Sequence, residues 1–138
     1  MTVIVGDTRI GVLACDTFVS TGYRATKIFR TKAKGIFGCA GDDTAIAKFE
    51  DWLLRRGNKP KLDAEDFTAL QLFGGKLYIW GTAMRPELVL SPYHAIGSGG
   101  AYALGCLAQG GTVAQALDIA ELYAEGVKHP FLTMRERP

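Results

Sequence analysis

A chain of 138 residues is long enough for one compact domain that buries roughly two-thirds of its unfolded surface, and we expect a single domain over residues 1–138. The formal net charge of +2 is too small to indicate nucleic-acid binding. The basic segments 24–34 and 55–56 lack aromatic residues spaced for base stacking and are interpreted as solvated faces. No apolar run approaches the roughly 18 residues of a membrane span, and no leader pattern is present, so we expect a cytoplasmic protein without membrane contact.

The first two apolar runs of the chain are rich in β-formers. Residues 2–6 and 11–16 are joined by a short polar turn and predict a β-hairpin. Pairing of the two strands would bring Asp16, at the end of the second strand, close to Thr2.

Two further β-rich stretches follow at 27–30 and 35–41, and a helical period begins immediately afterwards. Asp42 or Asp43 can cap this helix, and the basic pair followed by glycine at 55–57 favours its end there. Its expected apolar face comprises Ile46, Phe49, Leu53 and, as a further candidate, Leu54.

The second half of the chain opens with a hairpin pattern, in which strands at 69–73 and 76–80 are joined by Gly74 and Gly75. A short strand is predicted at 88–90. A glycine-rich turn then leads into two helices, expected at 101–108 and 113–125, with Thr112 as the N-cap of the second.

Strands grouped in runs and joined by hairpins favour antiparallel sheets, and helices in separate blocks need a sheet face to cover. The pattern by itself therefore predicts an α+β fold. Cys15, Cys39 and Cys106 show no Cys-x-x-Cys spacing and are expected to be free core thiols, and two histidines give no basis for a metal site. Segment 97–102 lacks the endings of nucleotide-binding loops, so no cofactor is expected.

Thr2 is the clearest candidate for a catalytic residue, because removal of Met1 would leave a free amine and a hydroxyl on one residue. A threonine hydroxyl needs a base to become a nucleophile, and an α-amino group with a pKa of about 7.7 to 8.0 is suited to that task near neutrality. A threonine at position 2 is also common in ordinary N-termini, so companion residues must decide between the two interpretations.

Several short motifs occur in an order that resembles the proteasome β-subunit family and its bacterial relative HslV, which are N-terminal-nucleophile hydrolases. The strongest is Ile-Gly-Ser-Gly-Gly-x-Tyr-Ala at 96–103. The others are a Thr-x-Ile-Val start at Thr2, Ala-x-Asp at 14–16, Thr-Lys-Ile at 26–28 and Gly-x-Ala-Gly at 38–41. The resemblance implies a four-layer αββα sandwich of two antiparallel sheets between helical layers, with one helix fewer than usual after residue 57.

The resemblance also assigns roles at the site. Lys27 matches the lysine beside the terminal threonine, Asp16 the acid that pairs with it, and Gly41 the backbone donor that faces the scissile carbonyl oxygen. Ser98 matches the serine that hydrogen-bonds near the threonine amine, although it could equally be a helix cap. The family's C-terminal aspartate has no clear counterpart, and either Glu125 or His129 could fill that position.

The activity implied by this likeness is threonine-type hydrolysis of peptide bonds in unfolded proteins. Substrate would bind as an added strand along Ser20, Thr21 and Gly41, with Val19 and Cys39 as pocket walls. Self-association into a ring and an ATP-dependent unfoldase partner are expected from the same likeness. Two other functions stay open: an inactive scaffold subunit of a proteasome-like assembly, and an amidase that acts on a small molecule.

Overall fold

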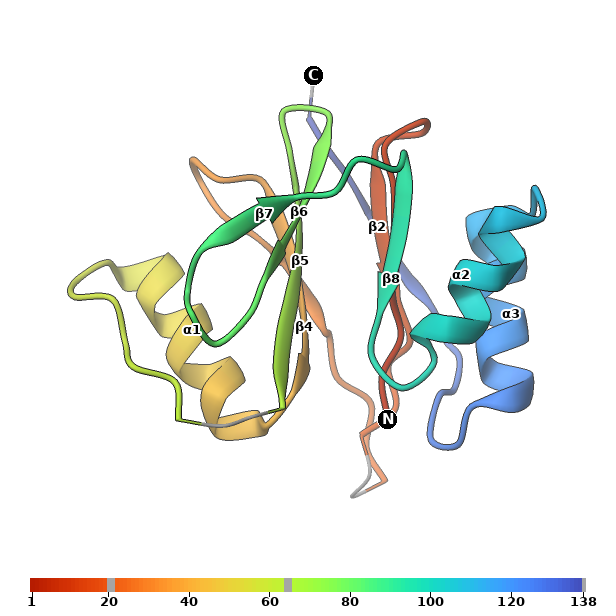
Figure 1. Ribbon diagram of the computed structural model, residues 1–138. Coiled ribbons are helices and arrows are strands. Elements are labelled where there is room, and N and C mark those ends of the chain that lie inside the picture. The colour runs from red at the N-terminus through yellow and green to blue at the C-terminus, as the bar shows by residue number, and fades with distance from the viewer. Residues whose placement is uncertain (20–21, 64–65, 138) are drawn as a thin grey trace.

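The computed structural model describes residues 1–19, 22–63 and 66–137, and within them the strands form two stacked antiparallel sheets (Figure 1). The four-stranded sheet has the order β8-β1-β2-β9 and the five-stranded sheet the order β3-β4-β5-β6-β7. The elements are β1 (Ile4–Asp7), β2 (Val12–Cys15), β3 (Ile28–Arg30), β4 (Ile36–Gly41), α1 (Asp43–Arg55), β5 (Phe67–Phe73), β6 (Lys76–Trp80), β7 (Pro86–Leu88), β8 (Tyr93–Ile96), α2 (Gly100–Ala108), α3 (Val113–Tyr123) and β9 (Leu132–Arg135).

Strands β1 and β2 form the predicted first hairpin, with Ile4 opposite Cys15. Both strands are buried along their whole length, because the second sheet covers one face and helices cover the other. A strand covered on both faces has a continuous apolar sequence, which explains why residues 2–6 and 11–16 show no alternation of polar and apolar residues.

Strands β5 and β6 confirm the second hairpin, and Gly74 and Gly75 adopt positive φ angles of 58° and 75° in its turn. The short strand predicted at 88–90 lies instead at 86–88, where Pro86 pairs with Trp80 at the sheet edge. Proline is tolerated there because an edge strand has one side without ladder partners.

Helix α1 begins as predicted, with the Asp42 carboxylate accepting a hydrogen bond from Ala45 N at 2.9 Å. Its buried side chains are Ala45 and Phe49, whereas Leu54 is 57% exposed. The inclusion of Leu54 in the apolar face was therefore wrong, because Leu53 already occupies the edge of the buried stripe one position earlier.

Figure 1 shows four layers: α1, the five-stranded sheet, the four-stranded sheet, and the pair α2 and α3. Three apolar clusters fill the spaces between these layers. Phe49 anchors the α1 layer by ring contacts with Phe37, Phe67 and Trp80 at 5.7, 5.1 and 5.5 Å between centroids. The four-layer α+β sandwich is thus confirmed, and it is thin on the side that α1 alone covers.

The sequence pattern did not predict two of the strands, β8 and β9. β8 pairs with β1 and β9 with β2, so they complete the first sheet on either side of the hairpin. β8 directly precedes the glycine-rich turn. β9 has the sequence Leu-Thr-Met-Arg, and half-buried and exposed residues alternate along it. Among the described residues, no helix is long and apolar enough to span a membrane.

Candidate active site

Thr2 lies just before β1, between the end of β2 and the turn that precedes α2. Val3 N donates to the Asp16 carboxylate at 3.1 Å, so the hairpin brings Asp16 next to Thr2 as expected. On the other side, Gly99 N donates to Thr2 O at 3.0 Å. Gly97 has a φ of 90°, and a Cβ there would lie 2.3 Å from Thr2 O, so glycine is required for this close approach.

The Lys27 ammonium joins Thr2 to Asp16. It donates to both Asp16 carboxylate oxygens at 3.0 Å and to Thr2 Oγ1 at 3.2 Å. The Lys27 side chain is only 11% exposed and Asp16 is fully buried. Charge-assisted hydrogen bonds of this kind fix both partners in a single geometry, so a cation is held against the Thr2 hydroxyl.

Ser98 contacts the backbone nitrogen of the same residue, because Thr2 N donates to Ser98 Oγ at 3.0 Å. The helix-cap interpretation of Ser98 is wrong, since Gly99 is the N-cap of α2 and no side chain caps that end. The hydroxyl is therefore free of a capping bond and lies beside the group that would become the Thr2 amine.

A cavity of about 580 Å³ opens beside Thr2 and Lys27. The predicted pocket residues Val19 and Cys39 line it, and so does Gly41. Gly41 has a φ of 119°, and a Cβ there would lie 2.1 Å from Asp66 O, which restricts this end of β4 to glycine. Ser20 and Thr21, the other predicted substrate residues, lie outside the described residues.

Met1 is attached to Thr2 and belongs to the same arrangement. Its carbonyl oxygen accepts a hydrogen bond from Lys27 Nζ at 3.1 Å, and its side chain lies against Gly126. While Met1 is present, Thr2 N is an amide nitrogen without basicity, so only its removal would supply the base that the threonine hydroxyl needs.

The C-terminal segment reaches the site through its backbone. Lys128 N donates to Asp16 Oδ2 at 3.4 Å, and Thr17 N donates to Lys128 O at 3.3 Å. The side chain of His129 is 75% exposed and pairs with Glu121 at 2.7 Å. His129 lowers the pKa of Glu121 mainly through its backbone N–H.

Glu125, the other candidate for the missing aspartate, is exposed. Within the described residues, neither Glu125 nor His129 has a side-chain hydrogen bond to Thr2 or Ser98. The contribution of Lys128 was missed because a backbone donor has no signal in the identity of its residue.

Comparison with solved structures decides the fold. Thiobacillus denitrificans BPH in complex with epoxomicin superposes with a TM-score of 0.71 at 17% sequence identity, over 100% of each chain. Eukaryotic HslV from Trypanosoma brucei gives a TM-score of 0.72 at 14% identity, over 96% of this chain and 97% of that one. The chain has the N-terminal-nucleophile hydrolase fold. A second structure of Thiobacillus denitrificans BPH gives 0.69 at 18%, again over 100% of each chain. No family model and no curated protein matches the sequence.

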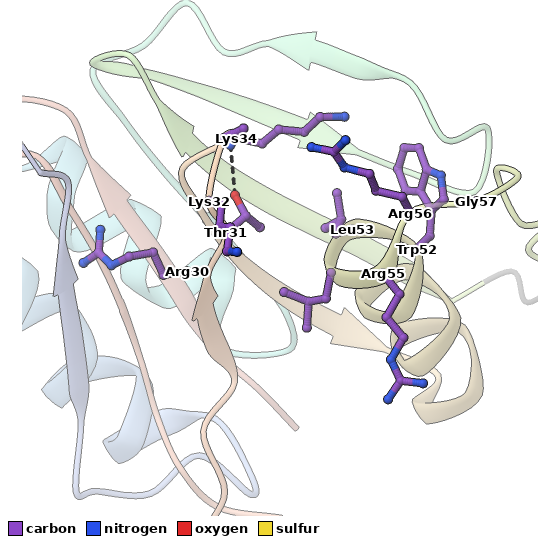
Figure 2. A pocket seen from close by; sticks show the side chains of 11 residues that line it. Arg30, Thr31, Lys32, Lys34, Trp52, Leu53, Arg55, Arg56 and Gly57 are labelled. Atoms are coloured by element: carbon purple, nitrogen blue, oxygen red, sulfur yellow. Dashed lines mark hydrogen bonds between the residues drawn. The ribbon is translucent and has the colours of Figure 1, made fainter.

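A larger cavity of about 750 Å³ in this N-terminal-nucleophile fold lies between the β3–β4 turn and the C-terminal end of α1. Figure 2 shows Lys34 and Arg56 near Trp52, with Arg30 on the far side of the cavity, and Lys34 Nζ lies 5.2 Å from the centre of the indole ring. Lys32, Lys34, Arg55 and Arg56 are exposed, in agreement with the interpretation of these segments as solvated faces, whereas Lys27 of the same segment is mostly buried. The Thr31 hydroxyl donates to Gly35 O at 2.8 Å and accepts from Lys34 N, so it is not activated as a nucleophile.

Two of the three thiols are unsuited to act as a second nucleophile. All three cysteines are free, with Cys15 and Cys39 buried and Cys106 half-buried rather than in the core. Burial raises the pKa of Cys15 to about 11 and also raises that of Cys39, so both stay protonated near neutral pH. No group of three metal-ligating side chains occurs among residues 1–19, 22–63 and 66–137.

Proposed function

We propose that the chain is a threonine-type peptidase that hydrolyses peptide bonds of unfolded proteins through Thr2 once Met1 has been removed. The observation that carries this proposal is the set of contacts at Lys27, which lies 3.2 Å from Thr2 Oγ1 and 3.0 Å from a buried Asp16. The Lys27 ammonium does more than neutralise the buried Asp16 carboxylate, because it also reaches the Thr2 hydroxyl, the group that would act as the nucleophile.

The first chemical step forms an ester. Thr2 Oγ attacks the carbonyl carbon of the scissile peptide bond, and the Thr2 amine accepts the hydroxyl proton. Gly41 N–H is the proposed donor to the oxyanion, since Gly41 lines the cavity beside Thr2. The tetrahedral intermediate collapses, the C–N bond breaks, and the leaving amine takes the proton from the Thr2 ammonium.

The second step releases the acyl group. Water loses a proton to the Thr2 amine as it attacks the ester carbonyl, the ester C–O bond breaks, and the proton returns to Thr2 Oγ. Throughout, Lys27 is a positive charge that disfavours a second positive charge on the nearby amine, which keeps that amine available as a base. Asp16 holds Lys27 in place and Ser98 orients the amine, the role suggested by its 3.0 Å bond to Thr2 N.

The substrate would bind as an extended strand along Gly41 and along Ser20 and Thr21. We further propose that the protein self-associates into a ring in the cytoplasm, because an open site of this kind would otherwise meet folded proteins, and that an ATP-dependent unfoldase supplies extended chains. The four-layer fold shared with HslV and BPH supports these assignments.

The test is hydrolysis of an unfolded polypeptide by the mature protein and its variants. Thr2→Ser should retain partial activity, because it keeps the hydroxyl and the amine, whereas Thr2→Ala should lose activity by about 10³-fold or more. Thr82→Ala, at an exposed position outside the cavity, is the matched control and should cleave like the parent. Cleavage by Thr2→Ala at the parental rate would contradict the proposal. Hydrolysis of small amides but not of polypeptides would indicate an amidase. Absence of any hydrolysis by the mature protein would indicate an inactive scaffold subunit.

A further inference from the structure

The cavity beside Thr2 has walls of two kinds. Val19, Ala25 and Ile46 give it an apolar lining, and Glu50 places a carboxylate on the α1 side. Asp43, Ile46 and Glu50 recur at helical spacing, so one face of α1 forms that side of the cavity. At a rise of about 1.5 Å per residue, Glu50 lies roughly 10 Å further along the helix axis than Asp43, so the two carboxylates occupy different places on that side of the cavity.

Glu50 has no partner for its charge within residues 1–19, 22–63 and 66–137: no ion pair and no side-chain hydrogen bond reaches its carboxylate. Among the described residues that line the cavity, one side chain is basic, that of Lys27, and both oxygens of Asp16 already bind it at 3.0 Å. Asp42, also on the wall, is engaged in capping α1. Glu50 is thus a charge that the described part of the fold leaves uncompensated.

The surroundings of Glu50 shield its carboxylate from part of the solvent. The side chain is half-buried, and burial raises its pKa. Its charge also acts on the thiol of Cys39, which is only 4% exposed, and adds to the effect of burial in raising the pKa of that thiol. A carboxylate that has lost part of its hydration gains most from a cation that brings hydrogen-bond donors.

We propose that this cavity selects a lysine or arginine side chain on the acyl side of the scissile bond, with Glu50 as the specificity-determining partner of its cation. The inference rests on the proposed peptidase function. Long basic side chains suit the shape, because their methylene stems can lie along Val19, Ala25 and Ile46 while the charged end reaches Glu50. A short side chain would leave the Glu50 carboxylate unpaired. An acidic side chain would bring a second negative charge close to it.

Two peptide substrates that differ only by arginine or citrulline before the scissile bond provide the sharpest test, since citrulline keeps the shape and loses the charge. The mature protein should cleave the arginine peptide with a kcat/KM about tenfold or more above that of the citrulline peptide. Glu50→Gln should reduce this ratio to near one, and Glu50→Lys should favour a glutamate peptide instead. Glu87→Gln, at an exposed position on β7, should keep the parental ratio.

A binding measurement separates failure of this inference from failure of the peptidase assignment. Thr2→Ala protein, whether or not the parent cleaves anything, should bind the arginine peptide about tenfold or more tightly than the citrulline peptide, and addition of Glu50→Gln should abolish the difference. Equal dissociation constants for the two peptides, or a ratio that survives Glu50→Gln, would overturn the role of Glu50.

Discussion

Replacement of Asp16 by asparagine tests the central contact of the site by its effect on stability. The Asp16 carboxylate is fully buried and accepts from Lys27 on both oxygens. It also accepts from Val3 N at 3.1 Å on one oxygen, and from Phe18 N and Lys128 N at 3.3 and 3.4 Å on the other. An asparagine can offer only one oxygen, so its NH₂ group must face either Val3 N or the other two donors.

The expected magnitude follows from these contacts. Each buried donor left without an acceptor costs about 1–3 kcal/mol, and breaking a buried ion pair by removing one charge costs about 3–5 kcal/mol in total. We therefore expect Asp16→Asn to lower the free energy of unfolding by about 3–5 kcal/mol. Lys27→Met should cost less, because three backbone N–H groups still satisfy the carboxylate. The double variant should be less destabilised than the sum of the singles, with a coupling of about 1–3 kcal/mol.

Urea unfolding at fixed protein concentration, followed by tryptophan fluorescence and circular dichroism, measures all four corners of this cycle. Trp80 is 5% exposed and packs against Phe49, so its emission reports on the sheet and the α1 layer. A cost below about 1 kcal/mol for Asp16→Asn, or strictly additive single variants, would refute a buried and coupled Asp16–Lys27 pair.

Three further predictions concern processing, assembly and pH. Intact-mass spectrometry of the protein from its native host should show loss of Met1, because Thr2 is small enough for ordinary methionine removal; complete retention would remove the proposed base. Light scattering should report an oligomer at micromolar concentration, and a monomer throughout would contradict the ring. Hydrogen bonds from Arg9 lower the pKa of Asp7, so folded protein releases that proton at lower pH than unfolded protein does. Asp7→Asn should unfold at lower urea than the parent at pH 7. The difference should shrink as the pH falls through the folded pKa of Asp7, which lies below the usual value of an aspartate carboxyl; a difference independent of pH would contradict this assignment.

Most of the fold could be predicted because local signals agreed with the final structure. The Gly74-Gly75 turn permits only a tight hairpin, Asp42 and Thr112 are strong caps, and the apolar runs at 2–6 and 11–16 needed cover on both faces. β8 and β9 could not be predicted in the same way. They are short, and what makes them strands is pairing with β1 and β2 from far along the chain.

At the site, the sequence placed Asp16 near Thr2 from hairpin geometry alone, whereas the contacts of Lys27 and Ser98 needed the family resemblance and then the structure. The backbone donor of Lys128 and the cavity position of Glu50 had no signal in sequence, because each depends on which way a segment faces after packing. The contact between Lys34 and Trp52 had no signal in the sequence for the same reason, because the β3–β4 turn and the end of α1 lie far apart in the chain.

Trapping of an acyl group on Thr2 is the most direct test of the account. Mature protein mixed with a peptide ester and quenched in acid within the first turnover should gain the mass of the acyl group. Peptide mapping should place that group on Thr2, and hydroxylamine should release it as expected for an ester. The Thr2→Ala variant should gain no mass under the same conditions. An acyl group on any other residue, or turnover of the ester without an adduct on Thr2 at any quench time, would contradict Thr2 as the nucleophile.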